Sequence, residues 1–300
     1  MSTVVALKPV MAAVSAAPAM EKVAVAPEPT FSAPAAEAAP RGETLRDVLR
    51  AVIPPLFGFG LLLGIWALVS MKNASIPSPG LTWDAAVKLF ADPFYSNGPN
   101  DQGIGWNVLA SLQRVGIGFG VAAAIGIPLG FIIGRFSFMN RMLDPIISLL
   151  RPVSPLAWLP IGLLVFQRAD PAATWTIFIC SIWPMILNTA EGVRRVPSDY
   201  LNVARVLGLP ETKVITRILF PAVLPYMLTG IRLSIGTAWL VIVAAEMLTG
   251  GVGIGFWVWD EWNNLKVEHI VIAIFVIGIV GLALEQMLLL LARRFSYETR

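Results

Sequence analysis

The chain has 300 residues, of which 56% are hydrophobic and only 14% are charged. Too little polar surface remains to cover a soluble globule, so the composition excludes a soluble domain and predicts an all-α polytopic membrane protein. The formal net charge of +3 comes from basic residues scattered among apolar stretches, which argues against a nucleic-acid-binding surface.

The sequence has too few cysteines and histidines for redox or zinc chemistry, and it lacks a nucleotide-binding loop. Cys180 is the only cysteine and His269 the only histidine, which excludes a disulfide framework and a multi-His or Cys/His metal site. The chain also lacks the G-x-x-x-x-G-K-[ST] loop that cradles nucleotide phosphates. We therefore expect no catalytic residue, metal site or cofactor in this chain, and if ATP drives it, ATP and magnesium are bound by partner subunits.

Residues 1–106 precede the main apolar region. Residues 1–40 are rich in Ala, Pro and Val but lack a clear signal-peptide core of about 7 to 15 uninterrupted apolar residues after a basic start, which predicts a disordered cytoplasmic tail. In residues 41–106, the stretch 53–70 is long enough to cross a bilayer, and an outer loop follows it. Within that loop, residues 82–90 with Trp83 resemble a short helix at the membrane interface.

Residues 107–295 are predicted to form the main transmembrane domain, with a short cytoplasmic C-terminus at 296–300. The expected spans are about 107–134, 143–166, 173–189, 222–248 and 270–291, which gives six with the first span. The first of these five contains glycines at positions 116, 118, 120, 126 and 130, where neighbouring helices could approach closely.

Three prolines interrupt the expected span 143–166. Pro152, Pro155 and Pro160 should break or kink the helix, because proline lacks an N–H group and its ring clashes with the preceding turn. Freed backbone groups at membrane depth are tolerated only inside protein or beside a wet cavity. This segment is therefore the first indication of a transport pathway.

Basic residues are distributed unevenly between the two sides of the predicted spans. Placing the N-terminus inside leaves only four lysines or arginines in the outer loops: Lys72, Lys88, Arg168 and Lys266. The cytoplasmic side then contains Arg135, Arg141, Arg194, Arg195, Arg205, Lys213, Arg217, Arg293, Arg294 and Arg300. The positive-inside rule favours this orientation.

The cytoplasmic loop 191–220 is unusually long and contains helix signals. Ser198 is expected to cap a helix over 199–207 that Gly208 ends, and Pro210 suits the first turn of a second helix that Pro221 follows. Apolar stripes on these helices, formed by Tyr200, Leu207, Val214 and Ile218, suggest a docking element. The alternative is an ordinary loop that packs on its own protein.

The spacing of four residues in this loop carries a family resemblance. Ala204, Gly208, Ile218 and Pro221 are spaced as in the cytoplasmic E-A-A, three residues, G, nine residues, I-x-L-P motif of binding-protein-dependent ABC importer permeases, which this sequence resembles. The sequence departs from the motif at Asn202 and Val203, where E and the first A are usual, and at Phe220, which replaces Leu. The missing acidic residue puts any particular ion pair with the ATPase in doubt.

The resemblance implies a type I importer fold, with a five-helix core over residues 107–295 and 53–70 as an added helix. It implies that the docking helices couple this chain to the ATPases through Tyr200, Asn202, Ala204, Gly208, Ile218 and Pro221. The implied partners are two ABC ATPase subunits, a periplasmic or lipid-anchored binding protein and a second permease copy, expected to be identical. The implied location is the bacterial inner membrane.

Two segments bear on the cargo. Residues 151–160 and 244–264 resemble the branch that imports nitrate, nitrite, cyanate or bicarbonate, and the taurine and sulfonate branch shares the first segment. The expected cargo is nitrate or nitrite, with bicarbonate, cyanate, taurine and alkanesulfonates as alternatives. A secondary transporter or channel is a further alternative, although no internal repeat is visible. A scaffold without a transport role fits the broken span poorly.

Ionisable residues inside the spans are candidates for function because they are costly to bury. By depth, Arg114 matches Glu246 in the outer half and Arg232 matches Glu285 in the inner half, which predicts two structural ion pairs. Alternatively, an arginine or the backbone N–H groups beside the prolines counter the charge of an anion. The predicted pathway residues are Arg151, Ser154, Trp158, Arg232, Thr237, Trp239 and Glu246, for which helix packing is the alternative role.

The outer loop 250–264 combines four glycines with Phe256, Trp257, Trp259 and Trp262. Aromatic residues of this kind often form a belt at the membrane interface. The alternative is a re-entrant gate that touches the binding protein through Asp260 and Glu261 as surface contacts.

Overall fold

The computed structural model describes residues 45–98 and 101–295. Contacts divide the chain into two units, residues 1–58 and 59–300, and the described part of the first unit is the start of helix α1 (Leu45–Lys72). Apart from one β-bridge between Ser96 and Gln102, the described residues form helices and connecting turns. The tail predicted at 1–40 and the C-terminus at 296–300 lie outside the described residues.

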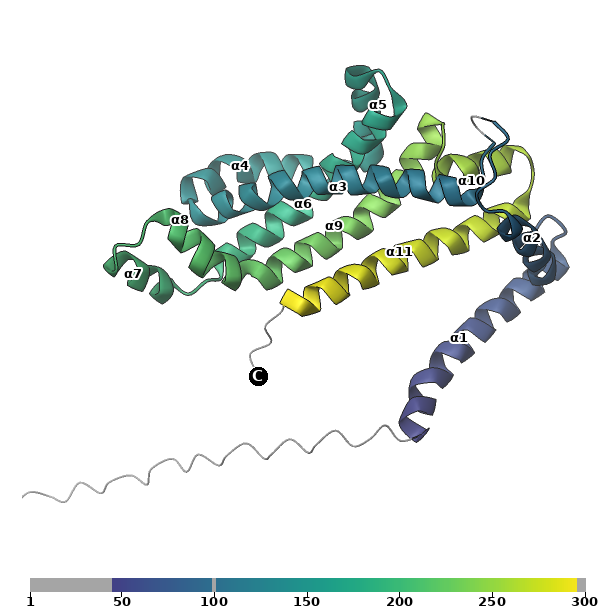
Figure 1. Ribbon diagram of the computed structural model, residues 1–300, viewed down its shortest axis with the longest axis horizontal. Coiled ribbons are helices and arrows are strands. Elements are labelled where there is room, and N and C mark those ends of the chain that lie inside the picture. Colours follow the sequence, from purple (N-terminus) through teal and green to yellow (C-terminus); the bar gives the residue numbers. More distant parts are fainter. Residues whose placement is uncertain (1–44, 99–100, 296–300) are drawn as a thin grey trace, which may run out of the picture. The chain divides into compact units, whose positions relative to one another are not determined.

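Among the described residues, the second unit contains the rest of α1, ten further α-helices and one π-helical turn. In chain order these are α2 (Pro79–Ala91), α3 (Ile104–Arg135), α4 (Ser137–Leu150), α5 (Pro155–Phe166), α6 (Ala169–Arg194), α7 (Ser198–Val206), α8 (Glu211–Val214), the π turn η1 (Ile215–Leu219), α9 (Phe220–Thr249), α10 (Ile254–Asn263) and α11 (Val267–Phe295). Figure 1 shows α7 and α8 at one end of the long helices α3, α6 and α9, and α10 at the other end.

Five segments are long and apolar enough to cross a membrane, counting the described residues only: Val52–Lys72, Ile104–Arg135, Ala169–Arg194, Glu211–Thr249 and Val267–Leu290. Helices α4 and α5 make a sixth span if the bent pair is counted as one. The prediction of about six membrane helices in an all-α protein is therefore confirmed.

Helix α6 packs between α3 and α9 and forms the centre of the bundle. Small residues make this possible, because a Cβ atom at Gly118 would lie 2.8 Å from the Cβ of Ile177, and one at Gly130 would lie 2.7 Å from the Cβ of Thr189. Gly126 faces α6 in the same way. The prediction was wrong for Gly116 and Gly120, where no atom lies within 4 Å of an added Cβ, because they lie on another face of α3.

The predicted break in the span 143–166 is present, and it lies at residues 151–154. Helices α4 and α5 meet there at an angle of 98°. Ser154 has φ −54° and ψ 133°, close to the polyproline conformation favoured before proline. Pro155 begins α5, where a missing N–H group does no harm. Pro160 lies inside α5 and does not break it.

Helix α2 confirms the short helix predicted at 82–90. It begins at Pro79, and the hydroxyl oxygen of Ser78 accepts a hydrogen bond of 3.3 Å from the backbone N–H of Leu81. This is an N-terminal cap, which satisfies one of the donors that a helix start leaves free. Trp83 is exposed on this helix.

Candidate functional site

The turn that ends α7 has the geometry of a glycine-based helix cap. Gly208 has a φ of +63°, and its N–H donates to the carbonyl of Arg205 at 3.0 Å. The N–H of Leu209 donates to the carbonyl of Ala204, also at 3.0 Å. These two bonds define a Schellman motif, which requires a left-handed residue at the position of Gly208. The prediction that Gly208 ends this helix is confirmed.

Helix α7 buries one small residue and exposes a larger apolar patch. Ala204 is 2% exposed, and it packs in a cluster with Val214 and Leu219. The exposed side chains, which we call the α7 patch, are Tyr200, Val203, Val206 and Leu207. Asn202 is also exposed, and Arg205 donates a hydrogen bond to it at 3.4 Å.

The second half of the predicted docking element faces inward. Val214 is buried and Ile218 is partly buried against the same core cluster, so these two residues do not continue the exposed stripe. The cap predicted at Ser198 is not formed, because Ser198 is the first residue of α7 and the helix is preceded by Pro197 with no side-chain cap.

The prediction that Pro221 ends the second helix was also wrong. The segment Glu211–Thr249 runs on through η1, where the N–H of Phe220 bonds to the carbonyl of Ile215. This wider turn lets the helix pass Pro221, whose ring would otherwise press on the carbonyl four residues earlier.

A pocket of about 420 Å³ lies beside the break between α4 and α5. We call it the α5–α9 pocket, because side chains of α5, α6 and α9 line it together with the break. Its lining consists of Arg151, Val153, Pro155, Trp158, Cys180, Trp183, Pro184, Leu187, Asn188, Leu233 and Thr237. Three predicted pathway residues, Arg151, Trp158 and Thr237, are therefore brought together here.

A second pocket, the α9–α11 pocket, has a volume of about 620 Å³ and lies on another side of α9. It is lined by Arg232, Thr237 and Trp239 among the predicted residues, and by Glu285. Arg232 forms an ion pair with Glu285, as predicted. Trp239 is buried, and its indole N–H donates to the carbonyl of Ile277 at 2.9 Å.

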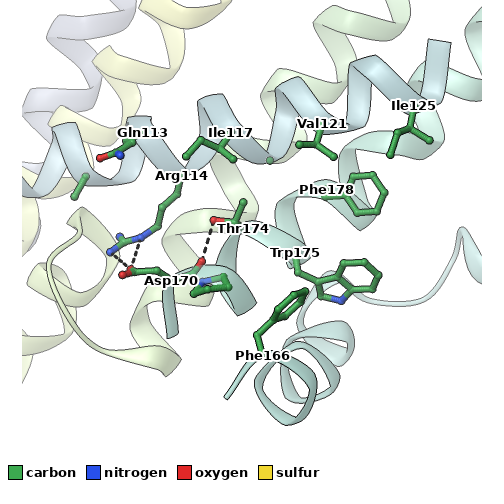
Figure 2. A pocket seen from close by; sticks show the side chains of 13 residues that line it. Gln113, Arg114, Ile117, Val121, Ile125, Phe166, Asp170, Thr174, Trp175 and Phe178 are labelled. Carbon is green, nitrogen blue, oxygen red and sulfur yellow. Dashed lines mark hydrogen bonds and ion pairs between the residues drawn. The ribbon is translucent and has the colours of Figure 1, made fainter. Parts of the chain in front are cut away.

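A third pocket, the α3–α6 groove, has a volume of about 710 Å³. Figure 2 shows its apolar wall, with Ile117 and Val121 from α3 facing Trp175 and Phe178 from α6. At one end of the groove, Arg114 donates hydrogen bonds to Asp170 at 2.6 and 2.9 Å. The charge of this arginine is thus shared with a carboxylate of α6 that the sequence prediction did not include.

Arg114 also contacts a buried carboxylate on α9. It donates a hydrogen bond of 2.6 Å to Glu246, which is 1% exposed, so the predicted pair of Arg114 and Glu246 is confirmed. The hydroxyl group of Ser111 lies 2.8 Å from both oxygens of the same carboxylate. Glu246 therefore belongs to a buried polar network and lines none of the three pockets.

This network also holds the start of α10. The backbone N–H groups of Gly253, Ile254 and Gly255 donate to Asn107 Oδ1, Ser111 Oγ and Glu246 Oε2, at 2.9, 3.0 and 3.0 Å respectively. Free N–H groups at a helix start need such acceptors when they are buried. Side chains of α3 and α9 thus cap the start of α10. We call Asn107, Ser111 and Glu246 the α10 clamp.

Most of the outer loop predicted at 250–264 forms helix α10, and half of this helix is buried. Glu261 is 6% exposed and lies 3.0 Å from His269 Nδ1 and 3.5 Å from Lys266 Nζ, so it is not a surface contact. Trp257 is buried and stacks on His269 with ring centroids 5.8 Å apart. Trp259 and Trp262 are the exposed members of the predicted aromatic belt.

The remaining predicted residue, Ser154, is exposed in the break and lines none of the three pockets. Sequence reasoning missed Asp170, Asn107, Ser111 and Asn188. Asp170 could have been predicted from the sequence, because it lies in the first turn of a span. The helix dipole favours an acidic residue there, and such a residue can reach an arginine at similar depth. The sequence does not distinguish Ser111 and Asn107 from other polar helix residues, because their partners at 253–254 are distant in sequence.

Comparison with known proteins identifies the family. Residues 126–297 match the family described as "Binding-protein-dependent transport system inner membrane component". The chain belongs to this family of membrane permease subunits. The family match lies almost entirely within the predicted domain 107–295, and the recognition of a binding-protein-dependent permease is confirmed.

Three relatives of this permease cover most of its length. The nitrate import permease protein NrtB of Synechocystis sp. is 48% identical over 236 residues, which is 78% of this chain and 86% of that protein. NrtB of Leptolyngbya laminosa is 47% identical over 257 residues, 84% of this chain and 91% of that protein. The bicarbonate transport system permease protein CmpB of Synechocystis sp. is 44% identical over 239 residues, 78% of this chain and 85% of that protein.

Proposed function

We propose that this permease is the membrane-spanning subunit of an ATP-driven importer and that its cargo is nitrate. The nitrate assignment rests on the 48% identity to a nitrate import permease over 86% of that protein's length. The 44% identity to a bicarbonate permease makes bicarbonate the second candidate. Membership of a binding-protein-dependent family favours an importer over an ATP-independent channel.

The α7 patch is the proposed docking site for the ATPase. Exposed apolar side chains on a short helix at the end of a transmembrane bundle are more stable in an apolar groove of a partner protein than in water. The Schellman motif at Gly208 fixes the angle between α7 and α8 and thereby the direction in which the patch faces. Two ATPase subunits, one for each of two permease copies, would engage these patches, with ATP and magnesium bound on the ATPases.

The proposed orientation places the α7 end in the cytoplasm and the α10 end outside. Arg135, Arg205, Lys213 and Arg217 lie at or beside the α7 end, which fits the excess of positive charge on cytoplasmic loops. The N-terminus would then be cytoplasmic, the membrane would be the bacterial inner membrane, and a binding protein would deliver the anion at the α10 end. Alternating access between the two sides would complete the transport cycle.

The cargo is tested by uptake in cells that lack this chain and are resupplied with it. Nitrate uptake that depends on ATP and on the resupplied chain supports the proposal, with bicarbonate and taurine measured in parallel. Restoration of bicarbonate uptake alone would assign the chain to the second candidate cargo. Restoration of taurine uptake alone would contradict both assignments.

The docking role is tested by Val206→Asp, with Val206→Thr as the matched control. Val206 is 87% exposed, so neither change disturbs the fold, and threonine keeps nearly the shape of valine without adding charge. A charge buried in an apolar groove without a partner is strongly unfavourable. We expect Val206→Asp to lower uptake and co-purification of the ATPase by about tenfold or more, while Val206→Thr stays near wild type. Normal assembly of the Asp variant would show that α7 does not dock.

A further inference from the structure

The three pockets differ in whether a carboxylate neutralises the charge of the arginine that lines them. In the α3–α6 groove, Arg114 contacts two carboxylates, and in the α9–α11 pocket Arg232 is paired with Glu285. The α5–α9 pocket is lined by Arg151 and by no aspartate or glutamate. Among the residues that the structure describes, no side chain forms a hydrogen bond or ion pair with the guanidinium of Arg151. This pocket therefore has a net positive charge.

Arg151 is exposed, and it lies level with the middle of two spans. It follows α4 at the break, and the same pocket is lined by Cys180 and Trp183 from the middle of α6 and by Thr237 from the middle of α9. A charged side chain in the middle of a membrane span normally has a partner or faces a water-filled cavity. A cavity with a mobile counterion meets that requirement without a carboxylate.

The other polar groups of the pocket suit an anion. Trp158 and Trp183 line the pocket, and within the described ranges their indole N–H groups donate to no protein acceptor, which leaves two donors without a protein partner. The amide group of Asn188 and the hydroxyl group of Thr237 already donate to backbone carbonyls of their own helices, at 2.8 and 3.0 Å. A guanidinium can also donate two parallel hydrogen bonds to one planar oxyanion.

The size of the pocket favours weak binding. Its volume of about 420 Å³ is more than ten times the share of about 30 Å³ that one water occupies in the liquid, so a small anion would keep part of its hydration. Transport requires a site that the ion can enter and also leave. A single arginine in a wet pocket meets both conditions.

We propose that the α5–α9 pocket is a transit site for a small, planar, monovalent oxyanion, in which the guanidinium of Arg151 binds the anion directly. This inference rests on the proposed function, because it concerns the route of the imported anion. Nitrate and bicarbonate share the required chemistry. Taurine carries an ammonium group besides its sulfonate, and the pocket offers no carboxylate to receive it, so the pocket should discriminate against taurine.

Cys180 provides a reporter for occupancy of this pocket. It is the only cysteine of the chain and it lines the pocket. In the purified complex of the permease with its ATPases and binding protein, we expect nitrate to slow the modification of Cys180 by methyl methanethiosulfonate, followed by mass spectrometry. Taurine at the same concentration should not protect the thiol. Cys180 is 8% exposed, so its modification without anions is measured first. A thiol that is modified without anions, and at the same rate with nitrate and with bicarbonate, would overturn the proposal, and if the thiol is not modified at all, the uptake rate of Arg151→Gln decides.

Arg151→Gln and Arg151→Lys test the role of the guanidinium. The Gln variant should lose protection of Cys180 and about tenfold or more of the nitrate uptake rate, because a charge-assisted hydrogen bond is removed. The Lys variant should keep part of both, since it retains the charge but not the planar fork. Arg141→Gln removes an exposed arginine from α4 outside the pocket and should change neither readout.

The outcomes separate the two proposals. If bicarbonate but not nitrate protects Cys180 and is imported, the nitrate assignment is wrong and the transit site stands. If the complex imports nitrate and Arg151→Gln does so at the wild-type rate, the transit site is wrong and the nitrate assignment stands. If the Gln variant does not assemble, protection of the wild-type thiol by nitrate or bicarbonate, but not by taurine, still decides the proposal.

Discussion

A guanidinium nitrogen of Arg114 on α3 lies 2.6 Å from a carboxylate oxygen of Glu246 on α9, and the Glu246 side chain is buried. The same arginine reaches Asp170 at the start of α6, so one guanidinium joins three helices of the bundle. Glu246 in turn accepts the N–H of Gly255 and holds the start of α10. The sequence predicted that this ion pair sets the register of two helices. In the structure it also holds the loop before α10, at the opposite end of the bundle from α7.

Glu246→Gln should loosen the α10 clamp. The side-chain NH2 of glutamine would face Arg114, the hydroxyl of Ser111 or the N–H of Gly255, all of which donate to the carboxylate in the wild type. We expect a loss of about 2 kcal/mol in the free energy of unfolding, because a charged hydrogen bond is lost but Arg114 keeps Asp170. Hydrogen exchange of the amides at 253–255 should rise, as measured by mass spectrometry.

Glu211→Gln is the matched control for this prediction. It removes one partner of the Arg135–Glu211 pair, which is 2.8 Å long but largely exposed at the α7 end. Exposed ion pairs contribute about 0–1 kcal/mol, so this change should leave the unfolding transition and the exchange at 253–255 nearly unaltered. Equal behaviour of the two variants would show that the clamp does not hold α10.

Gly130→Ala should destabilise the contact between α3 and α6. The added methyl group would lie 2.7 Å from the Cβ of Thr189 and 2.8 Å from the carbonyl oxygen of Ile186, so the helices must separate. Overpacking of this kind costs about 1–3 kcal/mol. We expect a lower unfolding temperature of the detergent-solubilised protein.

Gly116→Ala offers a control on the same helix, because no atom lies within 4 Å of its added Cβ. It should be neutral or slightly stabilising, since alanine has the higher helix propensity. A loss of stability as large as that of Gly130→Ala would mean that glycine is needed on α3 for another reason than close packing.

Much of the architecture could be predicted from the sequence because the membrane imposes strong rules. A span needs about 20 apolar residues, so the positions of the long helices followed from composition alone. Unpaired charges are unfavourable inside the bundle, and this rule paired Arg114 with Glu246 and Arg232 with Glu285 correctly. The break beside Pro155 followed from the stereochemistry of proline.

The details that failed depend on contacts that are distant in sequence. The hydroxyl of Ser111 acquires its role only when Ile254 lies beside it, and those two residues are more than a hundred positions apart. Gly116 and Gly130 look alike in sequence, and only the placement of α6 shows which of them is in contact. Asp170 was missed as a partner of Arg114 because two acids compete for one arginine, and sequence reasoning assigned only one.

Pro221 was misread for a different reason, which leads to the last prediction. A proline can end a helix or widen it by one residue, and the sequence does not show which. In an α-helix, the ring of Pro221 would press on the carbonyl of Arg217, and the missing N–H group would leave that carbonyl unpaired. The wider turn at Ile215–Leu219 avoids the clash and lets α8 and α9 form one continuous segment.

Pro221→Ala should convert this π turn into regular α-helix, because alanine restores the N–H donor and removes the ring. Loss of one inserted residue would rotate α8 by about 100° relative to α9, since an α-helix has 3.6 residues per turn. Val214 would then leave the core cluster that it shares with Ala204, and α7 would change its direction. We expect normal insertion with fewer nitrate ions imported per ATP hydrolysed, measured in proteoliposomes. Pro225→Ala removes a proline one turn further along α9, outside the π turn, and should leave this ratio unchanged. A structure of the Pro221→Ala variant that retains the π turn would show that proline is not its cause.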